Sequence, residues 1–115
     1  MKLPRRVRAE VPPPAEKRIA IGGRFLDEAR IRITRTSSLM FPLERHSATL
    51  GDEGTLTLST PMPVAVALFA EGCLAPVGGP PVDVLVYGQA LGPMVLREVS
   101  CGSDERMTYL VFEPT

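Results

Sequence analysis

Apolar and polar residues alternate with a period of two in several short stretches of the chain, the pattern of a strand with one buried face. Residues 29–35 place Ile31 and Ile33 on one face and arginine and threonine side chains on the other. Two further runs, 64–69 and 82–87, are apolar on both faces, as in strands buried from two sides. We therefore predict seven strands, at residues 18–21, 29–35, 55–59, 64–69, 82–87, 95–100 and 107–112.

Glycine and proline residues separate these runs, and the chain holds ten glycines and 12 prolines. Turns are expected where they cluster, because glycine adopts positive φ and proline fixes φ. No stretch has a helical period longer than about two turns, although residues 68–77 have room for one helical turn. The predicted turns lie at residues 22–23, 51–54, 61–63, 78–81, 92–93 and 102–104.

Several short strands at regular spacing are typical of a small barrel or sandwich. The predicted fold class is all-β, a small antiparallel β-barrel of six or seven strands. Residues 15–115 are expected to form this single β-barrel domain. Residues 1–14, which include the run Pro12-Pro13-Pro14, are expected to form an extended N-terminal arm rich in arginine and proline, because consecutive prolines favour the polyproline II conformation.

The charge of the chain sums to zero, with 13 basic and 13 acidic residues among 115. A protein that coats nucleic acid, a polybasic membrane binder or an acidic tail needs an excess of one sign, so these classes are not predicted. The balance is nevertheless uneven along the chain. Residues 1–35 carry ten basic and four acidic residues, a net of +6, and the remainder carries a net of −6.

The basic residues at the N-terminus are not followed by an apolar segment, so no signal peptide is expected. The longest apolar stretch, residues 64–70, is too short to span a bilayer. We therefore predict no membrane span and a cytoplasmic location.

Residues that could support catalysis are few and scattered. His46 has no nucleophile or orienting group arranged around it in the sequence, and we interpret it as a solvated loop histidine. Cys73 and Cys101 lack zinc-site spacing and are interpreted as small buried hydrophobes, which form a redox pair only if their Cα atoms lie within about 7 Å. The adjacent acids at 52–53 and 104–105 are interpreted as solvated turn charges. No enzyme, metal or cofactor is predicted.

Arginine outnumbers lysine by eleven to two. The guanidinium group binds phosphate and carboxylate through two parallel hydrogen bonds and stacks on planar bases, so this bias favours an anionic ligand or the acidic face of a partner. A charged strand face is also common without any ligand. The relevant residues are Arg5, Arg6 and Arg8 on the arm and Arg30, Arg32 and Arg35 on the predicted strand 29–35.

The order of several segments resembles a known family. Pro4-Arg5-Arg6-Val7-Arg8 precedes the first strand, and Ile33-Thr34-Arg35-Thr36-Ser37-Ser38-Leu39-Met40-Phe41 falls where a D/N-x-S-x-x-G motif would stand. Residues 50–58 follow as a glycine-acid turn and strand, and residues 109–113 as a closing strand. This order resembles the PilZ family, small β-barrel domains that commonly bind the bacterial second messenger cyclic di-GMP.

The resemblance implies a non-catalytic signalling or adaptor domain with a nucleotide ligand, cyclic di-GMP. The implied ligand-binding residues are Arg5, Arg6, Arg8, Arg32, Arg35, Ser37 and Ser38. The arm does not contain the family's R-x-x-x-R spacing. With Ser38 at the position of the motif's glycine, Ile33 stands at its acid, and with a one-residue insertion Arg32 does. The resemblance therefore leaves two versions open: binding of cyclic di-GMP, or binding of a protein partner only.

An alternative of a different class is a structural β-subunit of a larger assembly, such as a phage-like or secretion apparatus. An extended arm is suited to strand addition or to wrapping around a neighbour. The positive N-terminal region of one copy would then contact the negative remainder of the next. Nucleic acid is not an expected partner, because few aromatic residues are free to stack on bases.

Overall fold

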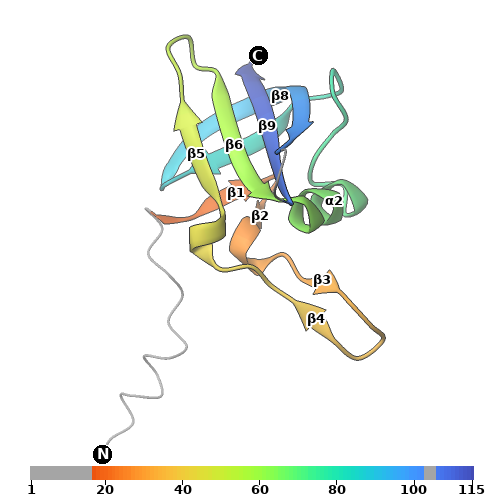
Figure 1. The fold of residues 1–115 in the computed structure, drawn as a ribbon. Coiled ribbons are helices and arrows are strands. Elements are labelled where there is room, and N and C mark those ends of the chain that lie inside the picture. Colours follow the sequence, from red (N-terminus) through yellow and green to blue (C-terminus); the bar gives the residue numbers. More distant parts are fainter. Residues whose placement is uncertain (1–16, 103–105) are drawn as a thin grey trace, which may run out of the picture.

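The computed structural model describes residues 17–102 and 106–115, and the body of the molecule is one antiparallel sheet of seven strands (Figure 1). The strands lie in the order β2-β1-β7-β8-β9-β6-β5. They are β1 (Ile19–Ile21), β2 (Arg24–Phe25), β5 (Ser47–Leu50), β6 (Leu56–Pro61), β7 (Val82–Val86), β8 (Gln89–Cys101) and β9 (Met107–Pro114). A second sheet contains β3 (Ile31–Arg32) and β4 (Ser38–Leu39), which form a separate hairpin.

The predicted all-β class and antiparallel pairing are confirmed. The sheet is not closed into a barrel, because β2 and β5 remain edge strands. A side chain satisfies part of the open edge: the Tyr87 hydroxyl accepts a hydrogen bond from the backbone N–H of Ala48 on β5, at 2.9 Å. Tyr87 lies in the β7–β8 turn with φ +52°, a value uncommon for a non-glycine residue.

The core is formed by the inward faces of the strands, and its largest fully buried side chain is Phe112 on β9. Leu56 and Leu58 on β6 and Leu110 on β9 are fully buried beside it. Leu56 and Leu58 alternate with threonine and serine, the pattern of a strand with one buried face. The long strand β8 pairs with β7 through its first half and with β9 through its second, so it joins the two parts of the sheet.

Residues 64–69, predicted as a strand, belong instead to the helix α2 (Met62–Ala70), and this prediction is wrong. A short run that is apolar on every side fits a buried helix as well as a buried strand, so periodicity alone does not separate them. Pro63 occupies the first turn of the helix, where its missing N–H costs nothing. Gly72 ends it at φ +79°, with Cys73 N donating to Leu68 O and Gly72 N to Phe69 O, the Schellman arrangement.

Two predicted turns are also corrected. Residues 61–63 form the junction between β6 and α2, and Gly92-Pro93 lies inside β8, where Gly92 has φ +80°. The predicted turns at 22–23 and 51–54 are present, whereas the turn predicted at 78–81 lies at residues 77–79. Residues 103–104 of the turn predicted at 102–104 lie outside the described residues. The predicted arm, residues 1–14, lies outside the described residues.

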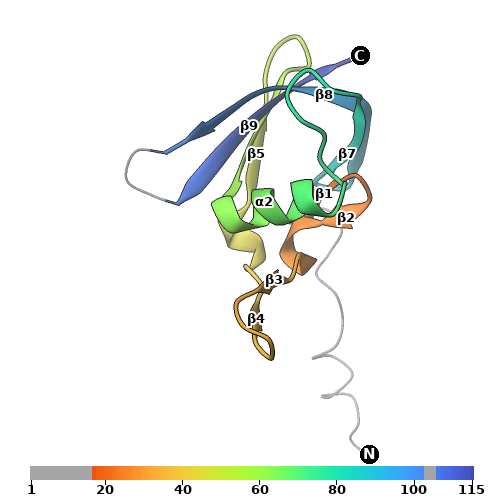
Figure 2. The ribbon, with the colours of Figure 1, turned by 90° about the vertical axis from the view of Figure 1, so that its right-hand side faces the viewer.

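Helix α2 and two short 3-10 helices, η2 (Leu26–Glu28) and η3 (Leu43–Arg45), complete the described elements. In the described part of the chain, no helix has the length and hydropathy needed to cross a membrane. Figures 1 and 2 both show the β3–β4 hairpin projecting from the body at the end opposite to the β5–β6 turn.

Candidate functional site

The β3–β4 hairpin has one polar and one apolar face because its two strands pair in register. Arg32 is paired with Ser38, and Ile31 with Leu39. Alternation places Arg30 on the same face as Arg32 and Ser38, and its Nη1 donates to Ser38 Oγ at 3.3 Å. The connecting turn is closed by backbone hydrogen bonds between residues 33–34 and Ser37.

The polar side of the hairpin and its turn form a hollow of about 350 Å³. Three guanidinium groups and four hydroxyl groups line it, and residues 29–43 contain no carboxylate. Such a set of donors matches a phosphate or another multiply charged anion. The lining residues are Arg30, Arg32, Thr34, Arg35, Thr36, Ser37 and Ser38.

The arginines of this hollow are exposed and form no ion pair within the described residues. The ion pairs found there join Arg18 to Asp27 and Glu28, Arg24 to Glu71, and Arg97 to Glu113. Arg30, Arg32 and Arg35 are in none of them. Three positive charges without an acidic partner among the described residues therefore lie on one short hairpin. An anion in the hollow would reduce their mutual repulsion.

Four of the seven residues that the sequence indicated therefore lie together: Arg32, Arg35, Ser37 and Ser38. Arg5, Arg6 and Arg8 lie outside the described residues, so their position relative to the hairpin stays a prediction. Arg30, Thr34 and Thr36 also line the hollow although the family resemblance did not indicate them. The alternation of residues 29–35 already places Arg30 on the same strand face as Arg32. Thr34 and Thr36 line the hollow because they lie in the tight turn at residues 33–37.

The prediction that His46 is a solvated loop histidine is wrong: its side chain is buried, with 6% of the residue exposed. Its Nε2 lies 3.3 Å from the carbonyl oxygen of Phe41 and its Nδ1 lies 2.8 Å from Thr60 Oγ1. Because a carbonyl only accepts, Nε2 carries the proton and Nδ1 accepts from the Thr60 hydroxyl. Burial lowers the pKa of His46 below its ordinary value of 6.5, although the Phe41 carbonyl and the Asp27 charge oppose that effect. His46 therefore anchors the chain that leaves β4 to the core strand β6.

The two cysteines are free thiols. Cys73 is half-buried against the core, whereas Cys101 is exposed, so the interpretation of both as buried is wrong for Cys101.

Asp52 and Glu53 are exposed in the β5–β6 turn as expected, and residues 104–105 are not among the described ones. Within residues 17–102 and 106–115, no three His, Cys, Asp or Glu residues lie close enough to hold a metal ion.

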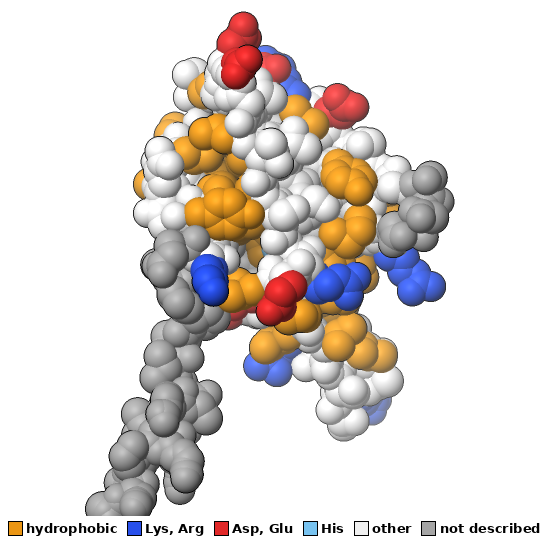
Figure 3. All heavy atoms as spheres, turned by 60° about the vertical axis from the view of Figure 1, so that its left-hand side comes forward, with side chains coloured by type: hydrophobic (Ala, Val, Ile, Leu, Met, Phe, Trp, Pro, Cys, Tyr) orange, Lys and Arg blue, Asp and Glu red, His pale blue; other side chains and the backbone are white. Residues whose placement is uncertain are grey.

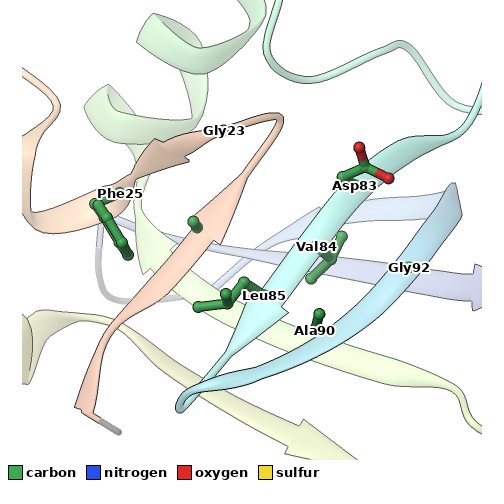
Figure 4. Close-up of a pocket in the computed structure, with 8 residues that line it drawn as sticks. Gly23, Phe25, Asp83, Val84, Leu85, Ala90 and Gly92 are labelled. Carbon is green, nitrogen blue, oxygen red and sulfur yellow. The ribbon is translucent and has the colours of Figure 1, made fainter. Parts of the chain in front are cut away.

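A second hollow, of about 390 Å³, lies against β1, β2, β7 and β8 (Figure 4). Its lining is apolar apart from the carboxylate of Asp83, and it includes Phe25, whose ring is covered by the Arg18 guanidinium at 3.7 Å. A binding site for a polar ligand needs several converging polar groups to fix its orientation. The hairpin hollow has them and this one does not, so the hairpin is the stronger candidate.

No protein-family model, curated protein or solved structure matches this chain.

Proposed function

We propose that this protein is a non-catalytic signalling or adaptor domain that binds a phosphate-bearing ligand on the polar side of the β3–β4 hairpin. The observation that carries the proposal is the hollow lined by three arginines and four hydroxyl residues without a carboxylate. Cyclic di-GMP is the ligand to test first, because the sequence resembles the PilZ family in this segment. A cytoplasmic location, where such a messenger occurs, belongs to the same proposal.

The donors of the hollow suit the chemistry of a phosphodiester. A guanidinium group can donate two parallel hydrogen bonds to the non-bridging oxygens of one phosphate, and its plane can stack on a purine ring. The hydroxyl groups of Ser37 and Ser38 add donors from the second half of the hairpin. Because the hairpin projects from the body, a ligand can reach this face without displacing core residues (Figure 2).

Calorimetric titration with cyclic di-GMP tests the proposal, with inorganic phosphate as the second probe. The double variant Arg32→Ala, Arg35→Ala removes two exposed guanidinium groups. Each hydrogen bond to a charged group contributes about 1.5–3 kcal/mol, so we expect affinity to fall at least about tenfold for each arginine removed. Raising the salt concentration should weaken binding to the unaltered protein as well.

Arg97→Ala is the matched control, because Arg97 is also an exposed strand arginine but pairs with Glu113 and lies outside the hollow. It should leave the affinity unchanged. An absence of heat with both probes at high protein concentration would exclude the ligand-binding version. The hairpin would then be a contact surface for a protein partner only.

A further inference from the structure

The apolar face of the hairpin is open, although a two-stranded hairpin is only marginally stable by itself in water. Ile31, at its base, packs against the core. Further along the same face, Ile33 is 58% exposed and Leu39 is 43% exposed. This face continues outward from the core with nothing over it in the described part of the chain, and the exposed Arg30 and Arg32 lie on the opposite face of the hairpin. The hairpin is only two strands wide, so a partner at its edge can contact the apolar face and the basic face together, and apolar and acidic side chains match them.

The opposite end of the same molecule has that complementary composition. The β5–β6 turn carries Asp52 and Glu53, both exposed, and beside them Leu50 is 52% exposed. Neither acid belongs to an ion pair among the described residues. Figure 3 shows Asp and Glu side chains at the upper end of the molecule, and most Lys and Arg side chains over the lower half, where hydrophobic side chains and also an acidic group lie among them.

The two surfaces lie at opposite ends of the molecule in Figures 1 and 2, so they cannot contact each other within one copy. We infer that a second copy of this chain is the partner, and that it places the acidic turn (residues 50–54) on the β3–β4 hairpin of its neighbour. Lying along the edge of the hairpin, the turn would place Leu50 toward the apolar face and Asp52 and Glu53 toward Arg32 and Arg35 on the polar one. Such a contact joins different surfaces of the two copies, so it closes into a ring or continues as a filament.

This inference goes beyond the proposed ligand and does not depend on it. Both nevertheless use Arg32 and Arg35, so a bound phosphate and a neighbouring copy exclude each other. A ligand that occupies the hollow would therefore dissociate the assembly. The same residues would give the domain two states, one associated and one bound to ligand.

Charge reversal at either end tests the contact by sedimentation velocity. The hairpin variant Arg32→Glu, Arg35→Glu and the turn variant Asp52→Arg, Glu53→Arg should each be monomeric, because like charges then face each other. Mixing the two variants should restore association, and so should combining all four changes in one chain. For the unaltered protein, we expect the association constant to fall at least about tenfold between about 0.01 M and 1 M salt, as the Debye length shortens from about 30 to 3 Å.

A control variant tests another exposed apolar surface, the outer face of helix α2. Val66 is 59% exposed there, between Met62 and Phe69, and Val66→Asp should leave association unchanged. Three results would overturn the inference: a monomer at every salt concentration, association that survives both charge reversals, or association that only Val66→Asp abolishes. The monomeric turn variant keeps its hairpin intact, so titrating it with cyclic di-GMP tests the proposed function separately.

Discussion

The buried His46 should make the free energy of unfolding depend on pH. The effect falls in the pH range between the pKa of His46 in the folded chain and its pKa in the unfolded chain. Its Nε2–H donates to the Phe41 carbonyl and its Nδ1 accepts from the Thr60 hydroxyl. Protonation places a charge in a buried position and turns Nδ1 into a donor, so the Thr60 hydroxyl has to accept instead of donate. The pKa of His46 is accordingly lowered by burial in the folded state from its ordinary value of 6.5.

The sign of the effect follows from proton linkage. Below pH 6.5 the unfolded chain binds a proton at this histidine before the folded chain does, so the free energy of unfolding falls. The contribution of His46 is complete above pH 6.5 and decreases as the pH falls toward the folded pKa. For a single group, the slope cannot exceed about 1.4 kcal/mol per pH unit.

Urea unfolding followed by far-UV circular dichroism measures this effect, since the chain has no tryptophan for fluorescence. The His46→Gln variant, neutral at every pH, should be less stable at neutral pH and should lack this component of the slope. The chain has a single histidine, so its ring resonances in a proton NMR titration report the pKa without assignment. A folded-state pKa above 6.5, or equal slopes in the two proteins, would refute this account of His46.

Three further substitutions test the fold. Gly22→Ala should destabilise by at least about 2 kcal/mol in urea unfolding, because Gly22 has φ +61° and an added Cβ would lie 2.3 Å from the backbone oxygen of Cys73. Tyr87→Phe should cost about 0.5–1.5 kcal/mol in the same assay, because it removes the hydrogen bond accepted from the Ala48 N–H; no measurable loss would mean that water replaces the hydroxyl. Phe112→Ala should cost about 3–5 kcal/mol, measured by the shift of the thermal midpoint, because its side chain is fully buried.

Most of the strand content could be predicted because successive side chains of a strand point to opposite faces, so apolar and polar residues alternate where one face is buried. Leu56 and Leu58, which alternate with polar residues, are both fully buried. The helix α2 was missed because its side chains are apolar on every face, which removes the periodic signal. Pro63 at its start and Gly72 beyond its end were the local signals that would have identified it.

The candidate site was only partly predictable for a different reason. The arginines at 30 and 32 could be placed on one strand face from alternation alone. The turn that brings Ser37 and Ser38 beside them depends on register, which a two-residue strand does not specify strongly. His46 was misassigned because its partner Thr60 is 14 residues away and nothing in the local sequence marks the contact.

The most direct test of the central proposal is a two-dimensional NMR titration of the monomeric turn variant with cyclic di-GMP. The proposal predicts saturable shifts in the amide and arginine side-chain signals of residues 30–38, and their loss in the background of Arg32→Ala and Arg35→Ala. Signals from the apolar hollow around Val84 and Ala90 should not shift. Shifts centred on that hollow, or no shifts at all, would contradict the proposal that the β3–β4 hairpin is the ligand-binding site.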